Sequence, residues 1–165
     1  MTKNIVNTAY IYIAIFSVVT IEIFCAKLAF ETLAEITSGL YFFVIAINIV
    51  PIVLILFNKQ KHVAMGIIAV IGFIIIPYQL YLGNKLINIK EEAANITAYV
   101  YAQKVDNGMY PKDISGYTFT FPELKKNFNY NQESLEQFTL YYYVGNEGTS
   151  HFYNSDTKKW GYYPD

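Results

Sequence analysis

Ionisable and polar residues inside apolar segments are the residues of this chain that could do chemistry. Glu22 lies in an apolar run that extends from Ile5 to Phe24, and Lys27 follows five residues later. An ionisable side chain in such a run must pair, face a cavity or stay protonated, so it is a functional candidate by default. Two interpretations remain open. Glu22 and Lys27 form an ion pair at a membrane interface, or Glu22 makes a polar contact with a partner or takes part in proton transfer.

Two further polar or small-residue features lie in apolar segments. Asn48, in the middle of the second segment, can hydrogen-bond to a neighbouring helix, and such bonds contribute about 0.6 kcal/mol in membranes. Gly66, Ala69 and Gly72 share one face of the third segment, where small side chains permit close helix approach. Packing within the chain or between copies explains both.

The sequence shows none of the usual patterns of catalysis or metal binding. His62 and His151 have no cysteine or acidic cluster near them at metal-ligand spacing, and Cys25 is the single cysteine, so no internal disulfide can form. There is no glycine-rich phosphate loop, nucleophile elbow or pair of carboxylates. The sequence therefore predicts a protein that is not an enzyme and holds neither a metal nor a cofactor.

Three apolar segments predict three transmembrane helices, at about residues 5–26, 40–57 and 63–82, each near the 20 residues that a crossing requires. Pro51 predicts a kink in the second, and Pro77 lies near the outer end of the third. Lys3, Lys59 and Lys61 must share one side of the membrane, whereas the loop after the first helix is acidic. The positive-inside tendency then puts the N-terminus in the cytoplasm and the C-terminal part outside.

The composition changes once along the chain, near Gly83. Of the whole chain 54% is hydrophobic and only 15% charged, against a usual charged share of about 25%, and the deficit lies before Gly83. We therefore predict a transmembrane domain over residues 1–83 and an extracytoplasmic domain over residues 84–165. All 12 basic residues are lysine and form no basic patch, which argues against a nucleic-acid partner.

The second domain begins as a helix and continues with short strands. Apolar residues at steps of three and four predict one buried stripe: Leu86, Ile89, Ala93, Ile96 and Val100. Asn107-Gly108 predicts the helix end, and Pro111 prevents its resumption. The pattern then predicts strands over residues 117–121, 138–144, 150–153 and 159–162, with a turn at 145–148. This order is typical of an α+β domain, in which the helix packs on a small antiparallel sheet.

A resemblance rests on the residues around this helix end. A helix followed by Asn107-Gly108-x-Tyr110-Pro111, then a tyrosine-rich strand, a glycine-containing hairpin and a closing Phe152–Trp160 segment, resembles the globular heads of type IV pilins and type II secretion pseudopilins. The resemblance covers the chain from Leu86 onward and implies a pilin-like head on a bacterial membrane protein. A pilin has one N-terminal helix after a short basic leader, whereas this chain has three apolar segments, so the resemblance implies fold more than filament assembly.

Tyrosines mark a candidate partner surface. Consecutive side chains of a strand point to opposite faces, so Tyr141, Tyr142 and Tyr143 alternate. At least one face of the strand must therefore show an aromatic side chain to solvent or to a partner. Tyr153 follows in the next strand. Tyrosine is enriched in protein interfaces, which favours a recognition surface. Filling and flanking the core of a small sheet is the alternative, and the sequence leaves both open.

These features predict a non-enzymatic protein of the bacterial inner membrane whose outer head binds a protein or envelope partner, as an accessory or assembly subunit. An immunity protein that protects its own cell from a membrane- or periplasm-acting toxin is the alternative. A transporter or membrane-enzyme subunit that uses Glu22 is the third. The expected partners are membrane lipid, an envelope protein and, for a homo-oligomer, a second copy of the chain.

Overall fold

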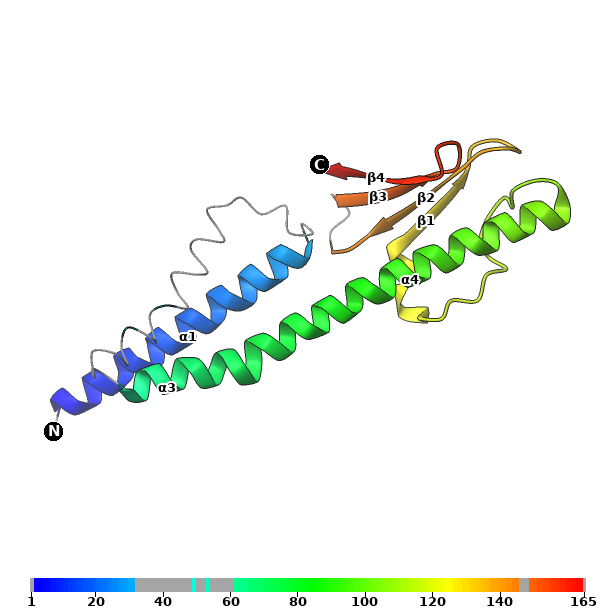
Figure 1. Cartoon of the computed structure of the whole chain (residues 1–165). Coiled ribbons are helices and arrows are strands. Elements are labelled where there is room, and N and C mark those ends of the chain that lie inside the picture. The colour runs from blue at the N-terminus through cyan, green and yellow to red at the C-terminus, as the bar shows by residue number, and fades with distance from the viewer. Residues whose placement is uncertain (1, 32–48, 50–52, 54–60, 146–148, 165) are drawn as a thin grey trace. The chain divides into compact units, whose positions relative to one another are not determined.

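The structure, a computed structural model, describes residues 2–31, 49, 53, 61–145 and 149–164. The chain divides into two compact units, Met1–Gly83 and Asn84–Asp165. The division falls at the residue near which the composition changes. We call the two parts the N-terminal unit and the C-terminal unit, and Figure 1 labels their elements.

The described part of the N-terminal unit is helical. It contains α1 (Thr2–Glu31), α3 (Lys61–Val70), the π-helical turn η1 (Ile71–Ile75) and the start of α4 (Ile76–Asn107). Helix α1 packs on α3, and a Cβ added at Gly66 would lie only 3.0 Å from Ile15 Cδ1. Glycine at this position therefore lets the Ile15 side chain approach the α3 backbone.

The π-helical turn has a local cause in Pro77. Proline lacks a backbone N–H, and inside a helix its ring collides with the carbonyl group four residues earlier, here that of Phe73. In η1 the Ile76 N–H donates to the Ile71 carbonyl, one residue further back than in an α-helix. This wider turn accommodates the proline, so the helix continues through Pro77 and Gly83.

The structure contains helices together with a four-stranded antiparallel sheet, but three transmembrane helices are not shown. Within the described residues one helix, Lys61–Asn107, is long and apolar enough to cross a membrane, by length and composition alone. Helix α1 covers the first predicted segment. The second predicted segment, with Asn48, falls almost wholly outside the described residues.

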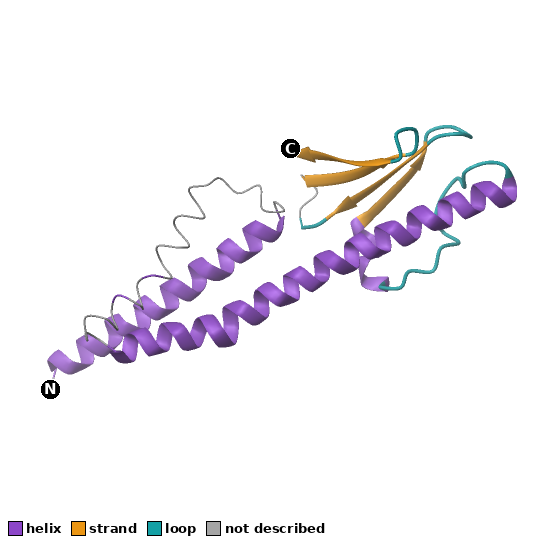
Figure 2. Cartoon of the chain, viewed as in Figure 1, coloured by secondary structure: helices purple, strands orange, loops and turns teal. Residues whose placement is uncertain are grey.

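The C-terminal unit packs one helix against one sheet. After α4 come a 3-10 helix, η2 (Pro122–Asn127), and four antiparallel strands in the order β1-β2-β3-β4. The strands are β1 (Phe128–Gln132), β2 (Phe138–Tyr143), β3 (Thr149–Asn154) and β4 (Lys159–Pro164). Figure 2 shows the sheet lying along the last part of α4. The predicted α+β order is confirmed.

The predicted apolar stripe and helix end are also confirmed. Ile89, Ala93, Ile96 and Val100 are all buried, whereas Leu86, the first residue of the predicted stripe, is only half-buried. Helix α4 ends at Asn107, where Gly108 adopts a φ of 75° and its N–H donates to the Lys104 carbonyl at 2.9 Å. A residue with a side chain would be strained in this left-handed conformation, which explains the glycine.

One predicted strand is wrong, and one strand was not predicted. Residues 117–121 form a loop, because the N–H groups of Thr120 and Phe121 donate to the Glu92 carboxylate instead of a strand. The first strand is β1 instead, with the sequence Phe-Asn-Tyr-Asn-Gln. Asparagine is depleted in strands, so composition argued against it.

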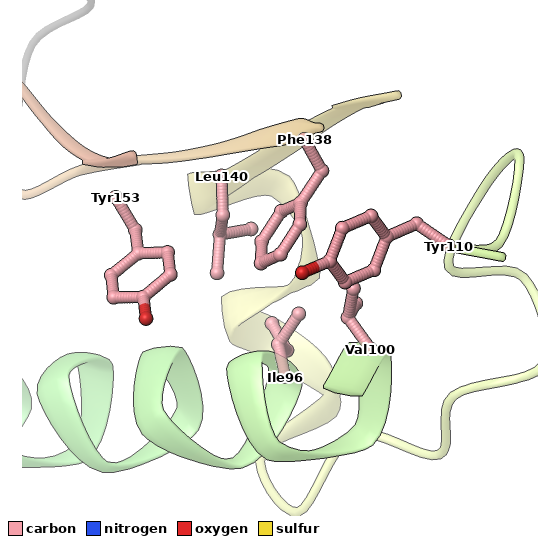
Figure 3. Packing of buried hydrophobic residues seen from close by; sticks show 6 residues of the cluster. All are labelled: Ile96, Val100, Tyr110, Phe138, Leu140 and Tyr153. Atoms are coloured by element: carbon pink, nitrogen blue, oxygen red, sulfur yellow. The ribbon is translucent and has the colours of Figure 1, made fainter. Parts of the chain in front are cut away.

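The core of the C-terminal unit lies between α4 and the sheet. In Figure 3 Ile96 and Val100 of α4 point toward Phe138, Leu140 and Tyr153 of the sheet, and Tyr110 reaches in from the loop after the helix. The Phe138 ring lies 4.7 Å from that of Tyr110 and 5.7 Å from that of Tyr153. Such aromatic pairs contribute about 0.5–1.5 kcal/mol each beyond their buried area.

The β3–β4 hairpin closes through an asparagine turn. Asn154 Oδ1 accepts hydrogen bonds from the N–H groups of Asp156 and Thr157, at 2.9 and 3.0 Å. Lys158 completes the turn with a φ of 54°, and it is the one described residue other than glycine with a positive φ.

Candidate partner-binding surface

Strand alternation divides the four tyrosines of the predicted partner surface between the two faces of the sheet. Tyr142 and Tyr153 are 4% and 8% exposed and lie on the face that packs on α4. Tyr141 and Tyr143 alternate with Leu140 and Tyr142 along β2, so they lie on the opposite, outer face, where both are partly exposed. The core therefore takes Tyr142 and Tyr153, and the candidate surface is reduced to Tyr141 and Tyr143.

Phe152 of β3 completes an aromatic patch on this outer face. It is the register partner of Tyr141, and the two ring centroids are 6.4 Å apart. On its other side Phe152 pairs with Gly161 of β4, and a Cβ added at Gly161 would overlap the Phe152 ring. The ring thus covers the glycine, an arrangement that compensates for the missing side chain in a sheet. We call Tyr141, Tyr143 and Phe152 the outer aromatic patch.

Polar residues border the outer aromatic patch. Asn129 and Asn131 of β1 are exposed, and their register partners on β2 are Tyr141 and Thr139. Lys159 of β4 is exposed as well. An aromatic centre with a polar border is the usual composition of a protein-binding surface.

A buried carboxylate, which the sequence analysis missed, holds the loop that leads from the helix to the sheet. Glu92 of α4 is 0% exposed. Its Oε1 accepts hydrogen bonds from the Tyr117 hydroxyl at 2.6 Å and the Thr120 N–H at 3.1 Å, and its Oε2 accepts one from the Phe121 N–H at 2.9 Å. Three donors stabilise the charge that burial would otherwise penalise. Burial, and then this bond to Glu92, raise the pKa of Tyr117.

A sequence signal for Glu92 was present. It falls three residues after Ile89 and four before Ile96, so it shares their face of the helix. An acid among the residues of an apolar stripe predicts a buried carboxylate with dedicated donors. Glu91, the preceding residue, lies off this face and is exposed.

The turn motif Asn107, Gly108, Tyr110 and Pro111 connects the end of α4 to the sheet. The Tyr130 hydroxyl donates to the Pro111 carbonyl at 2.7 Å, and Gln132 Nε2 donates to the Tyr110 carbonyl at 2.8 Å. Asn107 Nδ2 donates to Gln103 Oε1, within the helix. Burial raises the pKa of Tyr130 to about 12, and burial together with the Tyr101 hydroxyl raises that of Tyr153 to about 12. The motif is therefore structural.

The charged candidates of the N-terminal unit lie in the second half of α1. Lys27 forms an ion pair with Glu31, at 3.6 Å. A lysine and a glutamate four residues apart lie on the same side of a helix, so this pair forms easily. Glu22 is 3% exposed, and Cys25, on the next turn, is buried as well.

The small residues of α3 and η1 do not share one environment. Gly66 faces Ile15, as described above, whereas Ala69 and Gly72 are exposed. Nothing lies within 4 Å of a Cβ added at Gly72. The structure thus places a helix contact at Gly66, while Asn48 lies outside the described residues.

The two histidines lie in unrelated places. His62 is exposed in α3, whereas His151 of β3 stacks on Tyr142, with ring centroids 4.7 Å apart and ring planes at 15°. In the part of the chain that the structure describes, no group of three or more His, Cys, Asp or Glu side chains is arranged to hold a metal ion.

Comparisons with protein-family models, with curated proteins and with solved structures each found no match. The geometry of the chain itself offers an outer aromatic patch with a polar border, on the face of the sheet that the helical core does not use.

Proposed function

We propose that this chain is a non-enzymatic protein of the bacterial inner membrane whose C-terminal unit is a pilin-like extracytoplasmic head. The head binds a protein partner in the envelope through the outer aromatic patch, while three transmembrane helices anchor the chain as an accessory or assembly subunit. The observation that carries the proposal is the position of Tyr141, Tyr143 and Phe152 opposite the core.

The exposed side chains of the long helix support a membrane anchor. Only 22% of its most apolar 18-residue window is buried, whereas the core helix of a soluble protein would be mostly buried. Phe73 is 83% exposed, and Met65 and Leu80 are 64% and 68% exposed. Helices that are hydrophobic on all sides are stable in lipid, and exposing them to water would be costly.

The aromatic composition of the outer face of the sheet supports the partner surface. The core already receives Phe138, Leu140 and Tyr153 from the inner face. The outer aromatics add nothing to this core, and antiparallel sheets of one layer usually show polar residues on their wet face. Tyrosine and phenylalanine in that position are typical of a face that a partner covers.

The pilin-like fold is supported by the helix end and the sheet together. A left-handed Gly108, the buried Tyr110 and the hydrogen-bonded Pro111 carbonyl lead the chain from the helix to an antiparallel sheet that packs on it. The Asn-Gly-x-Tyr-Pro motif thus ends the helix and directs the chain to the sheet.

Two measurements on the full-length chain in bacterial cells test the proposal. An alkaline phosphatase reporter fused after Asp165 should be active, because that enzyme matures only outside the cytoplasm. A photo-crosslinking amino acid at position 141 or 143 should give one discrete adduct with another protein, and the matched change at the exposed loop residue Lys112 should not. An inactive phosphatase would refute the topology, and identical adducts from all three positions would refute the surface.

A further inference from the structure

We infer that a pocket between α4 and the inner face of the sheet binds a sugar unit that carries a carboxylate. The pocket has a volume of about 370 Å³ and is lined by Lys90 and Ala93 of α4, Tyr142 of β2, His151 of β3 and Trp160 of β4. All five residues belong to the C-terminal unit. The pocket lies on the opposite face of the sheet from the outer aromatic patch, so this inference goes beyond the proposed partner binding.

Aromatic rings form the sheet side of the pocket. The Trp160 ring lies 5.2 Å from that of Tyr142, which in turn stacks on His151 at 4.7 Å. Trp160 is 42% exposed, although a ring of this size in a small domain is usually covered. Ring faces carry negative charge density, and the C–H groups on one side of a sugar ring present an apolar, weakly positive surface that suits them.

The small side chain of Ala93 makes room for a ligand on the helix side. The stripe of α4 has isoleucine at 89 and 96, but position 93 between them carries only a methyl group. Ala93 is nevertheless buried. The space that a larger residue would fill is therefore left open beside the rings, and its volume is within the range of small-ligand sites.

Lys90 gives the pocket its charge. It is exposed, and neither ion pair found among the described residues includes it, whereas Lys27 and Lys104 are paired with Glu31 and Glu136. None of the described residues that line the pocket is acidic. An unpaired ammonium group beside apolar rings therefore selects an anionic group on the ligand, and a carboxylate can accept a charge-assisted hydrogen bond from it.

The choice of a sugar as the carrier of the carboxylate rests on the proposed extracytoplasmic location of the head, where acidic glycans are abundant ligands. The pocket itself requires only an apolar ring face and an anion held close to it. A peptide whose terminal carboxylate follows an aromatic residue would present related chemistry, and the experiment below separates the two.

Trp160 is the single tryptophan of the chain, so its fluorescence reports on this pocket directly. The purified full-length protein in detergent micelles is titrated with three compounds: methyl glucuronoside, methyl glucoside and phenylpropionate. The glucoside differs from the glucuronoside only in carrying a hydroxymethyl group in place of the carboxylate. We expect a saturable change in emission with the glucuronoside, and at least tenfold weaker binding of the other two compounds.

Two variants connect the binding to the pocket. Lys90→Gln should weaken glucuronoside binding about tenfold, because it removes the charge while keeping an exposed helical side chain. Lys159→Gln makes the same charge change next to Trp160, but strand alternation puts residue 159 on the opposite face, so binding should be unchanged. Ala93→Leu should fill the pocket and abolish binding, with the circular dichroism spectrum unchanged.

Other outcomes overturn the inference. Equal binding of glucoside and glucuronoside would exclude recognition of the carboxylate, and tighter binding of phenylpropionate would identify a peptide-terminus site instead. Binding that is lost equally in both lysine variants, or absent with all three compounds, would also refute it. These titrations use purified protein, so their outcome does not depend on the topology and crosslinking results that test the proposed function.

Discussion

The two parts of the helix Lys61–Asn107 use similar apolar residues in opposite ways. Before Gly83 large side chains such as Phe73 and Leu80 point outward and are exposed, whereas beyond it Ile89, Ile96 and Val100 are completely buried against a sheet. The first part is apolar on all sides and the second on one stripe. A helix's surroundings are thus encoded in the distribution of its apolar residues around the axis, more than in their number.

The largest loss of stability that tests this comparison is expected in the core of the C-terminal unit. Phe138→Ala should lower the free energy of unfolding of the C-terminal unit by about 3–5 kcal/mol, because it removes the ring around which Tyr110 and Tyr153 pack. Phe73→Ala removes the same ring from an exposed position and should change that free energy by less than about 0.5 kcal/mol. Urea unfolding in micelles, followed by Trp160 emission, measures both. Similar losses in the two variants would contradict the comparison.

A somewhat smaller loss is expected from the buried carboxylate. Glu92→Gln keeps the size of the side chain but sets an amide group against the N–H groups of Thr120 and Phe121. We expect a loss of about 2–4 kcal/mol in the same unfolding measurement. The adjacent change Glu91→Gln, at an exposed position, is the matched control and should be nearly neutral. If both changes were neutral, the loop would not depend on Glu92.

The N-terminal unit allows a matched test of helix packing. Gly66→Leu should push Ile15 away and destabilise the contact between α1 and α3 by about 1–3 kcal/mol. Gly72→Leu makes the same change where nothing lies within 4 Å, so the gain in helix propensity should be similar and the clash absent. Thermal unfolding of the helical circular dichroism signal in micelles compares the two. A lower unfolding midpoint for Gly72→Leu than for Gly66→Leu would place the close helix contact at Gly72 instead of Gly66.

The effect that is smallest at neutral pH appears only when the pH becomes alkaline. Tyr130 and Tyr153 keep their protons up to a pKa of about 12 in the folded unit, against about 10 in an unfolded chain. Between these values the unfolded chain binds fewer protons, so stability is complete below pH about 10 and falls as pH rises toward 12. Urea midpoints across this interval measure the slope, and Tyr130→Phe should reduce it. A slope unchanged in that variant would exclude Tyr130 as its source.

Local signals in the sequence were enough to predict much of the structure of the C-terminal unit. The stripe from Ile89 to Val100, the glycine at 108 and the β-forming run of β2 each have a nearby cause, namely helix periodicity, left-handed geometry and side-chain propensity. The division of Tyr141 and Tyr142 between two faces was also predictable from alternation. Alternation alone did not predict which of the two faces would be the outer one, because that depends on where Leu140 and Phe138 meet α4.

Features that depend on distant residues could not be predicted. Residues 117–121 alternate like a strand, but the N–H groups of Thr120 and Phe121 donate to a carboxylate 28 and 29 residues earlier in the chain. The strand β1 has a poor composition for a strand and exists because β2 offers it a partner edge. The pocket beside Ala93 depends on the register that brings Trp160 near Tyr142, which no pattern in the sequence reports.

The hairpin at Asn154 has a practical consequence for anyone who works with this protein. Lys158 pays the steric penalty of a backbone handedness that glycine adopts freely, about 1–2 kcal/mol for an ordinary L-residue. Lys158→Gly should therefore raise the melting temperature, even after the greater freedom of glycine in the unfolded chain is subtracted. Because Lys158 is exposed and lies in the turn between β3 and β4, this substitution offers a more stable sample for experiments.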